Sequence, residues 1–133
     1  MRARSMNILI VDDDSLIRDV LCRTVGYMGH TAIGACNGLD ALDVIHGRVA
    51  IKTNEPTIDL VISDCDMPAM SGPEMLAELK GNVTFSHIPV IMISGDHDNS
   101  KTALGLGACA FLSKPFSTDV LVSEINRALA PEV

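Results

Sequence analysis

The sequence predicts an α/β fold in which a five-stranded parallel sheet is doubly wound, with helices covering both of its faces. Five short apolar segments alternate along the chain with stretches whose apolar residues recur at helical spacing. Near-continuous apolar strands that alternate with helices are typical of a parallel sheet buried on both sides. The 133 residues, of which 47% are hydrophobic, provide the length of one domain and enough apolar side chains for its core.

The first half of the chain is expected to hold three strands and two helices. The strands are short apolar runs at Ile8–Val11, Thr31–Ala35 and Leu60–Ser63. The first helix should span residues 15–28, with Gly29 as its stop signal, and the second should begin near Asn37-Gly38. The apolar residues at helical spacing are Leu16, Ile17, Val20, Leu21, Val25 and Met28 in the first helix, and Leu39, Leu42, Val44 and Ile45 in the second.

The second half is expected to hold three helices and two strands. Ser71, Pro73 and Glu74 mark a helix start, because a serine cap, an early proline and the glutamate of a capping box stand in the preferred order. The residues of this helix that should face inward are Met75, Leu76 and Leu79. The later elements are a strand at Pro89–Ile93, a weak helix over Asn99–Leu106 near three glycines, a strand at Phe111–Ser113 and an amphipathic helix over Val120–Leu129.

Chemically distinctive residues follow or close four of these strands. They are Asp12, Asp13, Asp64, Ser94 and Lys114. The carboxyl ends of parallel strands gather along one edge of a sheet, where ligands bind. We therefore expect three acids, a hydroxyl and an amine to meet in one pocket. This set suits a metal ion and a phosphoryl group better than it suits general acid–base chemistry.

Each of these residues also has a structural alternative. An acid after a strand can cap the next helix, which is our interpretation of Asp14. Ser94 could be a structural hydroxyl, and a lysine before a proline is usually on the surface. The acidic run repels itself unless a cation neutralises it, and oxygen ligands of this kind favour Mg²⁺. A carboxylate held rigidly beside such a metal, as Asp64 would be, can attack phosphorus and carry an acyl phosphate.

Four segments taken together resemble the receiver domains of two-component response regulators, including single-domain chemotaxis-type regulators. They are ILIVDDDSLIR, DLVISDCDMPAMSG, IPVIMISG and GACAFLSKPF. The resemblance implies a flavodoxin-like (βα)5 sandwich with strand order 2-1-3-4-5. It covers a receiver domain at residues 7–130, between tails at 1–6 and 131–133.

The resemblance implies a role for each residue of the pocket. Asp64 is similar to the phosphoacceptor, and Mg²⁺ would be held by Asp12, Asp13, Asp64 and the backbone carbonyl of Asp66. Lys114 would contact the phosphate and precede a cis bond to Pro115. Ser94 and Phe111 correspond to the two switch positions. The phosphoryl group would come from a histidine kinase or a histidine phosphotransfer protein, so the chain would be a signalling domain and not an enzyme, with slow self-phosphorylation and autodephosphorylation.

The chain departs from the family pattern in two segments. The stretch from Asn37 to Asp64 is about seven residues longer than usual, which predicts a longer loop near Val49–Thr57. The stretch from Ser94 to Lys114 is about two residues shorter, which predicts a short or irregular fourth helix.

Composition limits the partners and the compartment. The net charge of −7 disfavours direct binding of nucleic acid and of anionic membranes. No apolar stretch has the roughly 20 residues of a membrane span. The four cysteines form no CxxC pair, and Cys22, Cys36 and Cys109 are expected to be small reduced core residues of a cytoplasmic protein. Cys65 is either a small packed residue or a redox-sensitive thiol.

Three alternatives stay open at this point. A phosphatase of the haloacid dehalogenase type also uses an Asp-x-Asp pair after a strand, as in Asp64-Cys65-Asp66, but its acidic pair normally follows that strand. A receiver-like module could bind partners without phosphorylation. The chain could also be part of a longer regulator. We expect a monomer or weak dimer that signals to an unknown downstream protein.

Overall fold

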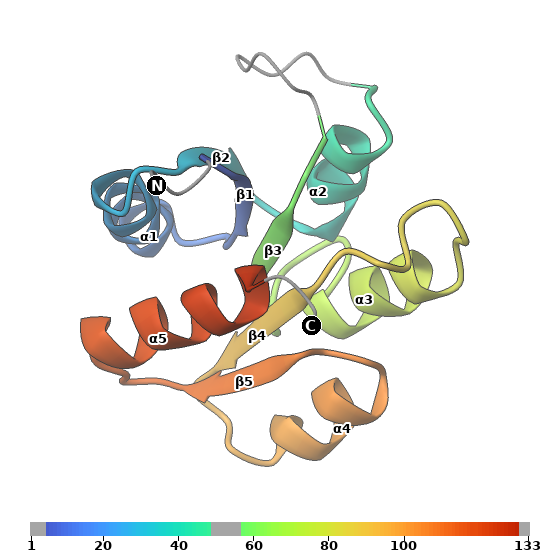
Figure 1. Cartoon of the computed structure of the whole chain (residues 1–133). Coiled ribbons are helices and arrows are strands. Elements are labelled where there is room, and N and C mark those ends of the chain that lie inside the picture. Colours follow the sequence, from blue (N-terminus) through green and yellow to red (C-terminus); the bar gives the residue numbers. More distant parts are fainter. Residues whose placement is uncertain (1–4, 49–56, 131–133) are drawn as a thin grey trace.

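The computed structural model describes residues 5–48 and 57–130, in which five parallel strands form one sheet (Figure 1). The strands are β1 (Asn7–Val11), β2 (Thr31–Ala35), β3 (Leu60–Asp64), β4 (Val90–Ser94) and β5 (Ala110–Ser113). Their order is β2-β1-β3-β4-β5, and every neighbouring pair is parallel. The predicted fold class and strand order are therefore confirmed, with strand ends shifted by a residue in several places.

Five helices cover the two faces of this sheet. They are α1 (Ser15–Tyr27), α2 (Gly38–Ile45), α3 (Gly72–Lys80), α4 (Asn99–Gly105) and α5 (Thr118–Leu129). One hydrophobic cluster joins the sheet to α1 and α5, and a second joins it to α2, α3 and α4. Figure 1 shows α1 and α5 on one side of the strands and the other three helices on the opposite side.

The alternation of side chains along the strands decides which face each site residue adopts. Ile62 and Ile93 belong to the cluster under α1 and α5, whereas Met92 belongs to the cluster under α2–α4. Successive strand residues point to opposite faces, so Asp64 shares the α1/α5 side with Ile62, and Ser94 shares the α2–α4 side with Met92. The acid and the hydroxyl thus reach the carboxyl edge from opposite faces.

Side-chain caps fix where most of the helices begin. The Asp14 carboxylate accepts hydrogen bonds from the backbone N–H groups of Leu16 and Ile17, so this acid starts α1 as expected. Ser71 and Glu74 form the predicted capping box of α3. The predicted shortness of the fourth helix is also found, since α4 has seven residues.

The expectation that Cys36 and Cys109 lie in the core is wrong. Cys36 directly follows β2 and Cys109 directly precedes β5, which are the two edge strands of the sheet, and both cysteines are exposed. In α1 the apolar stripe is wider than the core it covers, so Leu16 and Val20 are 76% and 61% exposed. The predicted long loop near Val49–Thr57 lies, except for Thr57, outside the described residues. Within the described part of the chain, no helix is long and apolar enough to cross a membrane.

Candidate functional site

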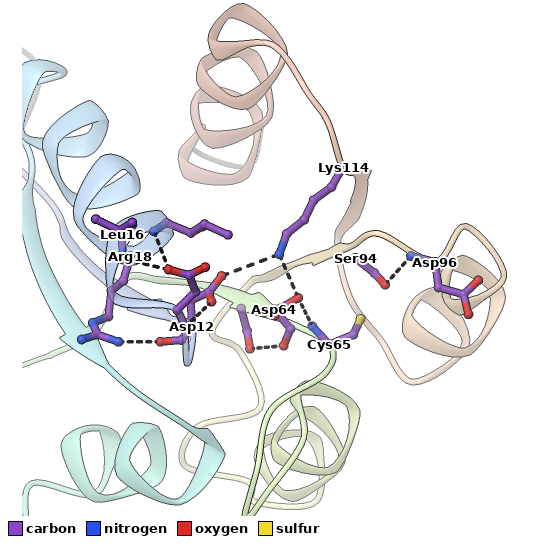
Figure 2. A network of polar contacts seen from close by, with 11 residues as sticks. Asp12, Leu16, Arg18, Asp64, Cys65, Ser94, Asp96 and Lys114 are labelled. Atoms are coloured by element: carbon purple, nitrogen blue, oxygen red, sulfur yellow. Dashed lines mark hydrogen bonds and ion pairs between the residues drawn. The ribbon is translucent and has the colours of Figure 1, made fainter.

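Three carboxylates meet at the carboxyl ends of β1 and β3. Asp12 and Asp64 are buried, Asp13 is exposed, and one ligand oxygen of each lies within 4.8 Å of the others. Figure 2 shows the Asp12 and Asp64 side chains approaching each other beneath the ammonium group of Lys114. This is the convergence that the strand-end positions predict, and it provides hard oxygen ligands for a divalent cation.

The acidic turn after β1 is held by hydrogen bonds to both ends of Asp12. The backbone N–H of Asp14 donates to Asp12 Oδ1 at 2.9 Å, and the Arg18 guanidinium donates to the Asp12 carbonyl oxygen at 2.7 Å (Figure 2). The Arg18 stem crosses β2 at Gly34, where a β-carbon would lie 3.3 Å from Arg18 Cδ. Arg18 therefore orients the turn that presents Asp12 and Asp13.

Asp64 is held by close backbone packing at the end of β3. The Cys65 N–H donates to Asp64 Oδ1 at 3.0 Å, and the Gly72 N–H donates to the Cys65 carbonyl at 2.9 Å. A β-carbon at Gly72 would overlap the Asp64 carbonyl oxygen and lie 3.0 Å from the Met92 sulfur. A glycine at this position lets the start of α3 press against the strand that carries Asp64.

Lys114 reaches the two buried carboxylates from the end of β5. Its ammonium nitrogen lies 3.4 Å from Asp64 Oδ1 and 3.9 Å from Asp12 Oδ2. Its backbone N–H donates to the Ser94 carbonyl at 2.9 Å, and its bond to Pro115 is cis, as the resemblance implies. Lys114 is thus placed both to offset the acidic charge and to contact an anion bound there.

Burial leaves the two carboxylates short of compensating charge. It raises the pKa of Asp12 above its usual range, although the Asp14 N–H and Lys114 oppose this. Burial also raises the pKa of Asp64; Lys114 lowers it, and the neighbouring Asp12 raises it further. A divalent cation would relieve this desolvation and repulsion, so the donor set fits Mg²⁺.

Other predicted site residues lie around this pocket. The Asp66 side chain is exposed and lies outside the carboxylate cluster found among the described residues, so its proposed contribution stays the backbone carbonyl. Ser94 is buried, and its Oγ accepts hydrogen bonds from the Asp96 N–H at 3.0 Å and from Asn99 Nδ2 at 2.9 Å. Phe111 is half-buried and lies beside Met92 in the sheet register.

Cys65 is 1% exposed and belongs to the apolar cluster under α2–α4. Burial, together with the charges of Asp64 and Asp66, raises the pKa of its thiol to about 11. A thiol that is buried and protonated at neutral pH reacts slowly with oxidants. The structure therefore favours the packed residue over the redox-sensitive thiol.

Three residues that shape the site were missed by sequence reasoning. Arg18 and Gly72 were visible as an arginine one turn into a helix and a glycine at a helix start, but neither pattern specifies what the residue touches. The sequence identifies Asn99 simply as the first residue of a helix. Its contact with Ser94 depends on the path of the loop between β4 and α4, for which the sequence carries no separate signal.

Comparison with known proteins decides the family. The response regulator receiver domain family matches residues 8–126. The chain belongs to this family. It is thus the receiver domain of a two-component response regulator, a signalling domain whose members share aspartate phosphorylation and magnesium dependence as general features.

Relatives of two kinds match this receiver domain. A chemotaxis protein CheY homologue of Campylobacter jejuni is 28% identical over 128 residues, which are 93% of this chain and 92% of the relative. The response regulator MprA of Mycobacterium tuberculosis is 31% identical over 127 residues, which are 94% of this chain and 51% of the relative. The chain thus spans nearly all of one relative and about half of the other.

A solved structure supports the same family assignment. A response regulator receiver domain protein from Clostridium thermocellum is 31% identical to this chain, with a TM-score of 0.80. The match covers 93% of this chain and 94% of that one. The fold is therefore shared over nearly the whole length of both proteins.

Proposed function

We propose that Asp64 accepts a phosphoryl group from a histidine kinase or a histidine phosphotransfer protein. The observation that carries this proposal is the position of its carboxylate at the end of a fully buried strand. Two further carboxylates lie within 4.8 Å and the Lys114 ammonium lies 3.4 Å away. A nucleophile held this rigidly between a metal site and a cation is arranged for in-line attack on phosphorus.

The transfer exchanges one bond to phosphorus for another. A carboxylate oxygen of Asp64 forms an O–P bond as the N–P bond of the donor phosphohistidine breaks, and the imidazole nitrogen leaves with the electron pair. Mg²⁺ held by Asp12, Asp13, Asp64 and the Asp66 carbonyl would supply positive charge to the transferring oxygens. Lys114 contacts the phosphoryl oxygens from the side of β5, where it already touches Asp64.

Acetyl phosphate tests the acceptor without a kinase. Wild-type protein with Mg²⁺ should gain the mass of one phosphate, and Asp64→Asn should gain none. Asp66→Asn is the matched control, because it changes an exposed acid two residues away and leaves its backbone carbonyl in place. Equal gains in wild type and Asp64→Asn would refute the assignment. Steady turnover of a small phosphomonoester would instead favour the phosphatase alternative.

The donor would dock on an apolar groove beside the pocket. The groove has a volume of about 440 Å³ and runs between α1 and α5, with Leu16, Val20, Pro115 and Phe116 among its lining residues. Because Lys114 is also in its lining, a protein seated there can bring its phosphohistidine to the acidic pocket. Leu16→Glu should slow transfer from a kinase at least tenfold and leave acetyl phosphate labelling unchanged. A fall in both rates would contradict docking at this groove.

The output would leave through the face formed by α4, β5 and α5. Once Asp64 carries phosphate, the Ser94 hydroxyl gains a charged acceptor and turns toward it, and Phe111 fills the vacated space. The half-buried Phe111 ring beside Met92 supports this switch. NMR of the Phe111 ring with and without the phosphate mimic beryllofluoride should show it becoming more buried. An unchanged ring environment would rule the switch out.

A further inference from the structure

Two N–H donors hold the Ser94 hydroxyl oxygen on the side of α4, and the Ser94 side chain also hydrogen-bonds the Cys65 thiol. Ser94 Oγ accepts from the Asp96 N–H at 3.0 Å and from Asn99 Nδ2 at 2.9 Å. Figure 2 shows the oxygen turned toward the backbone of Asp96 and away from the Asp64 carboxylate. A hydroxyl oxygen has two acceptor sites, so these two N–H donors occupy its acceptor capacity in this orientation.

The Asn99 bond is also a tie between the sheet and the first turn of α4. Asn99 is the first residue of this helix, and Asp98 before it makes no side-chain cap hydrogen bond with the described residues. Ala103 is the buried residue of α4, whereas Leu104 and Leu106 at its far end are 50% and 36% exposed. The helix is thus held by little apolar burial, and its N-terminal end is joined to β4 through the side chain of Asn99.

From this geometry we infer that Asn99 is a positioning residue that latches the Ser94 hydroxyl in its resting orientation. The inference rests on the proposed function, since it concerns how the same site responds to phosphate. To donate to a phosphoryl oxygen on Asp64, the hydroxyl must rotate away from Asn99. The same rotation releases the first turn of α4. Phosphorylation of Asp64 thereby changes the output face through the side-chain amide of Asn99.

The latch predicts that removing it makes the phosphate-bound state easier to reach. A single hydrogen bond between neutral groups contributes a small net free energy, which corresponds to a change of about three- to tenfold in an equilibrium constant. Asn99→Ala should therefore lower the Kd for beryllofluoride in the presence of Mg²⁺ by about three- to tenfold. This direction is opposite to that expected for a residue that merely keeps the domain folded.

A double-mutant cycle tests the inference. Beryllofluoride binding with Mg²⁺ is measured by calorimetry for wild type, Asn99→Ala, Ser94→Ala and the double variant. The tighter binding caused by Asn99→Ala should disappear when Ser94 is already alanine, because no hydroxyl is left to latch. Lys101→Ala, an exposed change on the same helix, should leave the Kd unchanged.

The outcomes separate this inference from the function on which it rests. Equal effects of Asn99→Ala in both backgrounds, or a Kd that is unchanged or higher in Asn99→Ala, would overturn the latch. Binding of beryllofluoride by the wild type would in that case still support the phosphate pocket. If wild type binds no beryllofluoride with Mg²⁺, the proposed function itself fails, and the latch fails with it. Thermal unfolding of every variant shows whether a change in Kd merely follows a change in stability.

Discussion

The two regions that meet at the carboxyl edge of the sheet are built differently. Around the acidic pocket, every residue of β1 and β3 is buried, and Asp12 and Asp64 are fixed by backbone hydrogen bonds. Around the proposed switch residues Ser94 and Phe111, one of the four β5 residues is buried, and α4 has seven residues, of which Ala103 is buried. The fold therefore places the proposed phosphorylation site on fully buried strands and a lightly held helix beside it.

This contrast has a physical basis in the cost of motion. Segments with little buried apolar area open or shift at low free-energy cost, whereas central strands move only with global unfolding. Ser94 lies at the boundary, because its strand β4 is fully buried while its hydroxyl bonds to the lightly held loop and helix. Changes on the pocket side should thus affect stability and chemistry, and changes on the α4 side should affect the response.

The largest effect is expected from a pair of glycine substitutions, one in each region. Gly72→Ala should destabilise the domain by about 3 kcal/mol, since its β-carbon would overlap the Asp64 carbonyl. Gly105→Ala is the matched change in α4, where a β-carbon would have no described neighbour within 4 Å. It should be neutral or stabilising by up to about 1 kcal/mol. Urea unfolding measures both, and similar losses at the two positions would contradict the contrast.

The next effect is expected from Lys114→Met, which removes the cation from the pocket. Its ammonium contacts Asp64 and Asp12, so phosphorylation by acetyl phosphate should slow by about 100-fold, the order expected when a charge-stabilising donor is removed. Lys101→Met, on α4, serves as the control for losing an exposed lysine. A rate for Lys114→Met within twofold of wild type would show that the ammonium has no role in transfer.

A smaller effect is expected in the pH dependence of metal-free stability. Folding raises the pKa values of Asp12 and Asp64 above their usual value of 3.8, so the folded protein favours their protonated forms. The contribution of these two groups to the free energy of unfolding is therefore fully present below pH 3.8 and is lost as the pH rises through their raised pKa values. Asp12→Asn keeps the acceptor for the Asp14 N–H and removes one charge. It should stabilise the metal-free protein at pH 7, on the order of 1 kcal/mol, and progressively less toward pH 4.

Thermal melts across this pH range, with Asp66→Asn as the exposed control, measure that gain. Mg²⁺ should raise the melting temperature of wild type and leave that of Asp12→Asn nearly unchanged, because binding stabilises a fold through linkage. A gain in stability that is independent of pH, or that appears equally in Asp66→Asn, would show that the burial and repulsion of the Asp12 and Asp64 carboxylates do not destabilise the metal-free fold.

The sequence was most informative about residues at strand ends, because the end of a strand determines where its last residue lies in the sheet. Asp12, Asp64 and Lys114 could be placed at a common edge, because parallel strands align their carboxyl ends whatever the details of packing. Helix starts at Asp14 and Ser71 were predictable for a similar reason, since a cap acts on backbone groups two or three residues away.

Features that depend on what covers a surface could not be predicted. Leu16 and Val20 fit the helical period, but their exposed side chains line the groove between α1 and α5 and do not enter the core. The exposure of Cys36 and Cys109 likewise depends on neighbouring elements and not on the local apolar composition. The hydrogen bond from Asn99 to Ser94 depends on the conformation of the loop between β4 and α4, so residue spacing alone cannot predict it.

Amide hydrogen exchange with and without beryllofluoride, in the presence of Mg²⁺, tests the contrast most directly. We expect altered exchange from the loop after β4 through α4, around Asn99–Gly105, while β1 and β3 exchange at unchanged rates. Asn99→Ala should raise exchange in α4 before any ligand is added. Changes limited to the acidic turn and the loop after β3, with α4 unaffected, would contradict the proposed difference between the two regions.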